Sequence, residues 1–290
     1  MTMNFLALLI SLLLDQALRH LETMRGPRWF YAYYESLGFF AQSPSFWRAG
    51  TGVLVIVLVP TVATLFVGHL LDHIWNALGF VFSVLLLLLT LGPRDLHTQV
   101  GEYIEAIQSG DEQKAGILAR EILGTEPPAD AAARSEAVTH AVLAESNDHL
   151  FGIFFWFALL GPAGAVLFRS VDFLRRAPAA EARSDEFVGA VNRLYGLLAW
   201  IPAHLAALGY ALAGSFEDVI SDIKVFYANC SAKFFQVNND VLVCAGLGAL
   251  RASAEEPGTG RLRSALLLVR RTVIIWLVIY FFITLIGWAW

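Results

Sequence analysis

Charged side chains are scarce in this 290-residue chain, of which 16% is charged and 57% is hydrophobic. Average soluble domains carry about 25% charged residues. This chain therefore has too few polar side chains to cover a water-facing globule of its size. The same composition excludes a disordered chain, because disordered chains are poor in apolar residues. The composition predicts an integral membrane protein.

Cysteine and an excess of basic charge are also missing. The two cysteines, Cys230 and Cys244, cannot build a disulfide framework and are expected to be free apolar thiols. The formal net charge of -5 provides no general basic field, so nucleic acid is not an expected partner. The sequence contains neither a Gly-x-x-x-x-Gly-Lys-Ser/Thr phosphate loop nor a Gly-x-Ser-x-Gly nucleophile elbow.

Long apolar runs are abundant instead. Between residues 49 and 91 the only ionised residue is Asp72, and this stretch is about twice the roughly 20 residues that one membrane span needs. We expect a helical hairpin there, with spans at about 51–69 and 74–91 joined by a polar turn. Further spans are expected at 150–168 and 272–290.

Two apolar segments have more than one interpretation. Residues 4–14 form a run that is short for a span. Residues 194–213 are long enough, but Pro202 interrupts them. This second segment is therefore either a kinked span or a re-entrant element shielded by protein, because broken backbone cannot face lipid.

The segments between the spans predict helices and no sheet. Residues 97–148 carry ten acids and three bases, with apolar residues at helical spacing, and Asp130 is placed to cap a helix. Ser215 begins a pattern that resembles a capping box and predicts the start of another helix. The predicted fold is an all-α integral membrane protein with about four to five transmembrane helices and a small extramembrane helical domain. Basic residues occur in segments that the expected spans place on both sides of the membrane, so the positive-inside rule does not decide the orientation of the chain.

The expected organisation has six parts. They are an N-terminal amphipathic or membrane helix and connector (1–48), a transmembrane hairpin (49–92), an acidic extramembrane helical domain (93–148), a core membrane helix with a Gly-Pro element followed by a Pro-broken apolar helix (149–214), extramembrane helices and a loop (215–260), and a C-terminal transmembrane helix (261–290).

One group of possible metal ligands lies at the expected hairpin turn. His69 and His73 are four residues apart, hence on one helix face, and Asp72 is adjacent. Two histidines at this spacing without a third fixed ligand are a weak metal signal. The wet turn of a hairpin is the better interpretation, with a metal site as the alternative.

A second polar group surrounds the third expected span. Asn147, Asp148 and His149 precede it and Arg169 follows it. A straight helix would separate Asp148 from Arg169 by roughly 30 Å. End-capping and snorkelling are therefore the simple interpretation of these residues.

The same region resembles the CobD/CbiB family. The resemblance is carried by residues 154–156 (Phe-Phe-Trp), 160–169 (Leu-Gly-Pro-Ala-Gly-Ala…Phe-Arg), 200–205 (Trp-Ile-Pro-Ala-His-Leu) and 94–96 (Arg-Asp-Leu). It covers most of residues 80–220. The family includes the membrane protein of adenosylcobinamide-phosphate synthesis and its relative AmpE, which is linked to β-lactamase induction. The resemblance thus implies either a nucleotide-dependent, amide-forming enzyme or a regulatory membrane protein.

The chain departs from the synthase pattern at several acidic positions. Asp148 keeps one acid of the pattern. After Arg169 the pattern has Asn-Thr-Leu-Asp where this chain has Asp172, Phe173, Leu174 and Arg175, so the second acid is absent, and His204 stands where the pattern has Arg. The other replacements are Ala144, Glu145, Ile153, Tyr195, Gly196 and Ala199. Since amide formation with a nucleotide needs acids for Mg²⁺, the resemblance favours an AmpE-like regulatory protein without catalysis.

Two alternatives stay open beside this interpretation. One is a surviving amide-forming enzyme with a site built from Asp148, Arg169, Asp172 and His204, which would use a nucleotide. The other is an accessory subunit or scaffold. For the favoured interpretation no cofactor is expected, and the expected location is the bacterial inner membrane, crossed several times. The expected partners are the bilayer and either another membrane protein or a second copy of the chain.

Overall fold

The computed structural model describes residues 2–17, 30–34, 36, 50–91, 96–177, 184–230, 237–251 and 259–288. Every regular element in these ranges is a helix, which confirms the predicted all-α membrane fold. The chain divides into two compact units, which are described separately. Unit 1 comprises Met1–Pro93, Gly152–Trp200 and Tyr280–Trp290, and unit 2 comprises Arg94–Phe151 and Ile201–Ile279.

Three helices are long and apolar enough to cross a membrane: Thr51–Ile74 within α4 (Gly50–Ile74), α11 (Asp185–Ala213) and Thr259–Gly287 within α14 (Thr259–Trp288). Shorter apolar helices are found in α1 (Thr2–Ala17) and α5 (Asn76–Leu91). The expected span at 272–290 is confirmed by α14 as far as the described residues extend. Residues 194–213, which had two interpretations, lie in α11. This helix continues through Pro202, so the interpretation as a broken, re-entrant element is wrong.

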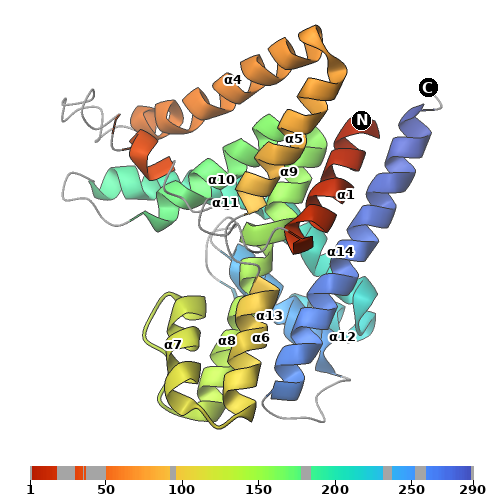
Figure 1. Cartoon of the computed structure of the whole chain (residues 1–290). Coiled ribbons are helices and arrows are strands. Elements are labelled where there is room, and N and C mark those ends of the chain that lie inside the picture. The colour runs from red at the N-terminus through yellow and green to blue at the C-terminus, as the bar shows by residue number, and fades with distance from the viewer. Residues whose placement is uncertain are drawn as a thin grey trace. The chain divides into compact units, whose positions relative to one another are not determined.

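Helices α1, α4 and α5 pack together in unit 1 (Figure 1). Ser11 of α1 donates its hydroxyl to the Ala7 carbonyl at 2.7 Å and to the Val84 carbonyl of α5 at 3.3 Å. These bonds satisfy a hydroxyl that is fully buried, as a polar group in an apolar environment requires. The short helices α1 and α5 are therefore fixed to each other by polar as well as apolar contacts.

The expected single span at 150–168 is wrong. The chain forms α9 (Gly152–Leu160) and α10 (Pro162–Arg176), two helices that pack against each other. Gly161 lies between them at φ 65°, a left-handed conformation that suits glycine, and Pro162 starts α10, where no amide hydrogen is needed. A Cβ on Gly164 would lie 2.0 Å from the Trp156 carbonyl oxygen, so only glycine permits this packing.

Unit 2 contains α6 (Leu96–Gln108), α7 (Glu112–Leu123) and α8 (Ala131–Ser146), followed by a π-helical turn, η2 (Asn147–Phe151). Asp111 caps α7 by accepting the Lys114 amide at 2.9 Å, and Asp130 caps α8 by accepting the Ala133 amide at 2.9 Å. The predicted cap at Asp130 is confirmed. These caps fix the ends of two helices of the acidic segment.

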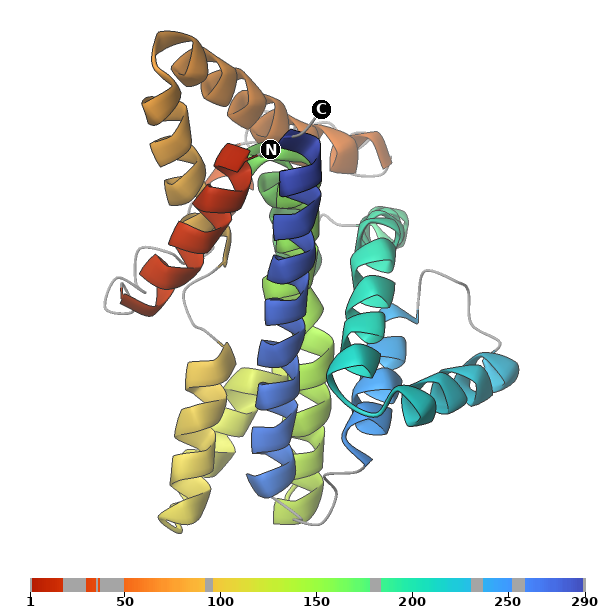
Figure 2. The ribbon, with the colours of Figure 1, turned by 90° about the vertical axis from the view of Figure 1, so that its right-hand side faces the viewer.

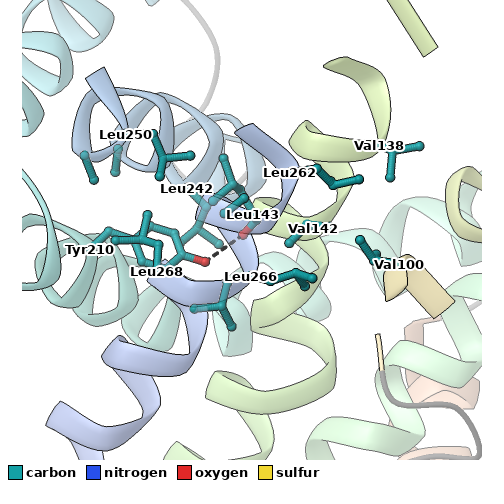
Figure 3. Packing of buried hydrophobic residues seen from close by; sticks show 14 of the residues in the cluster. Val100, Val138, Val142, Leu143, Tyr210, Leu242, Leu250, Leu262, Leu266 and Leu268 are labelled. Carbon is teal, nitrogen blue, oxygen red and sulfur yellow. Dashed lines mark hydrogen bonds between the residues drawn. The ribbon is translucent and has the colours of Figure 1, made fainter. Parts of the chain in front are cut away.

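The remaining elements of unit 2 are α12 (Phe216–Asn229) and α13 (Asn238–Ala249), with parts of α11 and α14. Helix α12 starts where the sequence predicted, but Ser215 bonds the Asp218 carboxylate at 2.5 Å instead of capping the backbone. The core of the unit is apolar, and its members include Val100, Val142, Leu143, Leu242 and Leu266 (Figure 3).

Candidate functional site

Arg169 and Asp172, two of the four candidate site residues, lie together on α10 in unit 1. Arg169 Nη1 donates to Asp172 Oδ2 at 3.0 Å, and both side chains are buried. Arg175 Nη2 and Arg176 Nε donate to the other carboxylate oxygen, Oδ1, at 3.1 and 2.7 Å. Residues three and four apart share one helix face, which is why three arginines converge on one acid.

The arginines control the charge of Asp172. Burial alone would raise the pKa of the carboxyl, but the positive charges of Arg176, Arg169 and Arg175 outweigh burial and lower this pKa to about 2. Asp172 is thus ionised at neutral pH. Within this group, called the α10 arginine cluster below, three guanidinium groups bond one carboxylate.

Aromatic rings hold two members of the α10 arginine cluster. The Arg169 guanidinium lies 4.6 Å from the centre of the Phe173 ring, and that of Arg175 lies 4.0 Å from the centre of the Tyr195 ring. Cations within about 6 Å of an aromatic face are attracted to it. Tyr195 is one of the positions at which the synthase pattern differs, and here its ring supports an arginine and packs beside Phe168.

Asp148, the third candidate, lies in η2 of unit 2. Asn147 and Asp148 are both buried, so the snorkelling interpretation is wrong for them, although Asn147 does follow the last residue of α8, with its backbone amide bonded to the Ala144 carbonyl. The straight helix assumed between Asp148 and Arg169 is wrong as well, because the chain turns at Gly161. Single π turns within helices occur frequently at functional sites.

Asn147 has a feature that sequence reasoning missed. Neither its amide nitrogen nor its amide oxygen has a hydrogen-bond partner among the described residues. A buried polar group without a partner costs about 1–3 kcal/mol. Beside it, His149 Nε2 lies 3.3 Å from a Glu145 carboxylate oxygen. The polar triplet at 147–149 was the available signal, but nothing in the sequence showed that the helix continues through it.

His204, the fourth candidate, also lies in unit 2, on α11. Its Nε2 atom lies 2.6 Å from the Tyr227 hydroxyl of α12, and the two rings are stacked with centres 6.4 Å apart. One turn and a half further along α11, the buried Tyr210 hydroxyl donates to the Leu143 carbonyl at 3.1 Å and lies 2.6 Å from the Ser146 hydroxyl (Figure 3). His204 therefore joins two helices of its own unit.

The possible metal ligands of the hairpin lie elsewhere than expected. Helix α4 continues to Ile74, so His69, Asp72 and His73 lie in the helix and the turn falls at Trp75. Asp72 packs on α5, where a Cβ on Gly79 would lie 1.7 Å from its Oδ1 atom, while His69 and His73 are exposed. Among the described residues no group of three or more His, Cys, Asp or Glu side chains could hold a metal ion.

The α10 arginine cluster does not fit Mg²⁺. Both oxygens of Asp172 accept hydrogen bonds from guanidinium groups, and a divalent cation would lie beside three positive charges. Anionic groups are the ligands that such a cluster favours, since arginine binds carboxylate and phosphate with charge-assisted hydrogen bonds. The described geometry of this cluster thus supports anion binding without supporting a metal.

The helical fold, the membrane-length helices and the buried pair of Arg169 and Asp172 define an α-helical membrane protein that contains a buried ionic cluster. A family model described as CobD/Cbib protein matches residues 8–259. The chain belongs to the CobD/CbiB family.

Two curated relatives resemble part of the chain. The cobalamin biosynthesis protein CobD of Stutzerimonas stutzeri (strain A1501) is 29% identical over 171 residues, which are 58% of this chain and 55% of the relative. That of Chromobacterium violaceum is 32% identical over 178 residues, 58% of this chain and 54% of the relative. The chain thus spans about half the length of these relatives. No solved structure matches the chain.

Proposed function

We propose that the chain acts in cobalamin biosynthesis, as the membrane protein of an amide-forming step. The membership of the CobD/CbiB family and the two relatives, both named as cobalamin biosynthesis proteins, support this role over a signalling role. We place the protein in the bacterial inner membrane, crossed by several helices. This proposal reverses the order of the two functions that the sequence alone favoured.

The observation that carries the proposal is the α10 arginine cluster. Arg169 matches the arginine of the family pattern, and it is buried and bonded to the buried Asp172. A guanidinium has five N–H donors, so one arginine can bond more than one acceptor. Arg175 and Arg176 bond the same carboxylate and are partly exposed. An anionic substrate group, a carboxylate or a phosphate, fits a cluster of guanidinium groups.

Growth of a bacterium that lacks its own CobD protein tests the proposal. The chain is expected to restore cobalamin-dependent growth, whereas the Arg169→Ala variant is not. Exposed Arg193 on α11 provides a matched control, since Arg193→Ala removes the same charge outside the cluster. Added cobinamide should rescue every strain. Failure of the unaltered chain to restore growth, although it is present in the membrane, would refute the enzymatic role.

A second candidate is the AmpE-like regulatory role, which one observation favours. Tyr195 and Ala199 stand where the synthase pattern has other polar groups, and both are buried, Tyr195 beneath the Arg175 guanidinium. These positions cannot supply carboxylates to a catalytic site. In this case deletion of the gene would alter β-lactamase induction in the native host and leave its corrinoids unchanged.

A further inference from the structure

One apolar stripe of α12 is only partly covered. Phe216, Ile220, Ile223 and Tyr227 follow the spacing i, i+4, i+7 and i+11, which places them on one face of the helix. The two ends of this stripe are exposed, Phe216 by 52% and Tyr227 by 38%. The adjoining face packs on α13, where a Cβ on Gly248 would lie 3.1 Å from the Cα atom of buried Val219, and Ile223 of the stripe is partly buried against the core of the unit.

Helix α12 begins directly after a helix that is long enough to span a membrane. Only Gly214 and Ser215 separate it from α11. The Gly214 amide bonds the Tyr210 carbonyl at 2.9 Å, and the Ser215 amide bonds the Ala249 carbonyl at 3.4 Å. The start of α12 is therefore fixed at the end of α11.

Helix α14 shows where the water boundary falls beside α11. After Arg270 and Arg271, both exposed, the chain contains no further charged side chain up to Trp290. Basic residues at the end of an apolar run reach toward the membrane surface. Thr272 lies beside Gly209 of α11, where a glycine Cβ would meet the Thr272 methyl at 2.4 Å. Gly209 is thus close to the boundary.

The hydrogen bond between His204 and Tyr227 locates the C-terminal end of α12 relative to the membrane boundary. Within unit 2, α11 and α14 run in opposite directions (Figure 2). His204 precedes Gly209 by five residues, so it lies roughly 7–8 Å farther to the apolar side. Tyr227 extends its side chain toward His204, with the two polar atoms 2.6 Å apart. The face of α12 that carries Tyr227, and with it the apolar stripe, is directed to the apolar side.

We propose that α12 is an interfacial helix that lies in the surface of the bilayer crossed by α11 and α14. Its stripe of Phe216, Ile220, Ile223 and Tyr227 contacts the boundary between lipid headgroups and acyl chains. An interfacial helix buries its apolar face to a depth of about 5–10 Å, which agrees with the height of His204. The occupant of this face is lipid, because Tyr227 of the stripe bonds His204, and next to His204 on the apolar side of Gly209 the apolar side chains of Leu205 and Leu208 are exposed.

The charges around α12 predict which lipid headgroups the helix needs in order to insert. Arg251 pairs with Asp218 at 3.3 Å and with Asp222 at 2.6 Å, so these three groups carry one negative charge. Glu217 and Lys224, both exposed, cancel each other. Since no positive excess attracts anionic headgroups, zwitterionic phosphatidylcholine is sufficient.

Spin labels at two positions of α12 test the proposal. Cys230 and Cys244 are first replaced by serine and alanine, and Ile220→Cys or Val225→Cys is then labelled in phosphatidylcholine vesicles. Val225 is the matched control, since it is apolar and 59% exposed but lies on the opposite side of the helix from the stripe. The label at 220 should collide with oxygen and be protected from a water-soluble nickel reagent, and the label at 225 should show the reverse.

Three outcomes would overturn the proposal. They are equal access of the nickel reagent to both labels, dipolar broadening at 220 that grows with protein concentration and indicates a second copy, and insertion only when anionic lipid is added. Hydrogen–deuterium exchange of the unaltered chain gives a second readout that needs no substitution. The amides of α12 should exchange at least several-fold more slowly in phosphatidylcholine nanodiscs than in a detergent that leaves the surface uncovered, and an unchanged rate contradicts the proposal.

Discussion

Replacing Asp172 with asparagine should strongly destabilise unit 1. The substitution keeps the size of the side chain but removes the charge that balances three arginines, one of them the buried Arg169. Removing one partner of a buried ion pair costs about 3–5 kcal/mol. For a chain of this size, such a loss corresponds to a fall in Tm of roughly 6–15 °C.

The pH dependence provides an independent check on the same residue. The pKa of Asp172 is lowered from 3.8 to about 2 in the folded protein. A lowered pKa stabilises the folded state above the ordinary pKa, and this contribution is lost as the pH falls from about 4 toward 2. The shift corresponds to roughly 2 kcal/mol. The difference in Tm between wild type and Asp172→Asn should therefore be largest at pH 7 and decrease below pH 4.

Intrinsic tryptophan fluorescence during heating in detergent measures both effects, because the chain has eight tryptophans. Glu186→Gln is the matched control, since Glu186 is exposed in the first turn of α11 and surface substitutions change stability by about 0.5 kcal/mol or less. The reasoning is refuted if Asp172→Asn melts within a degree of wild type at pH 7. A difference that stays constant from pH 7 to pH 3 would refute the electrostatic explanation.

Three further predictions concern other parts of the fold. Gly164→Val should separate α9 from α10 and lower the Tm by several degrees, because even a Cβ would lie 2.0 Å from a carbonyl oxygen, whereas Gly101→Ala meets nothing within 4 Å and should be neutral or stabilising. Tyr210→Phe should cost about 1–2 kcal/mol in a thermal melt, since it removes a buried hydroxyl with two partners; an unchanged Tm would show that these bonds contribute nothing. Asn147→Leu should raise the Tm while lowering the growth restored in the CobD-deficient host, because the amide is buried without a described partner; full growth would show that Asn147 has no functional role.

Sequence periodicity and composition predicted the helical membrane fold, the long C-terminal helix and the cap at Asp130. These features depend on local chemistry and on the solvent. The turn at Gly161 was not predictable in the same way, because a Gly-Pro pair can either kink a helix or end it. Only the packing of α10 on α9, seen at Gly164, decides between the two.

The candidate site shows the same division. Arginines at three residues before and three and four residues after Asp172 are visible in the sequence, and their shared helix face was a signal that the sequence reasoning left unused. The burial of Asn147 and Asp148 was not visible, since it depends on helices that come from distant parts of unit 2. The bond between His204 and Tyr227 joins residues 23 positions apart, so no local pattern indicates it.

Mass spectrometry of the corrinoids in a CobD-deficient host tests the proposed function most directly. Without the chain, a corrinoid that still carries the free carboxylate should accumulate. Expression of the chain, or of its Arg193→Ala variant, should convert that corrinoid to the amide, and expression of the Arg169→Ala variant should not. Accumulation of the carboxylate form despite normal amounts of the unaltered chain in the membrane would contradict the assignment to cobalamin biosynthesis.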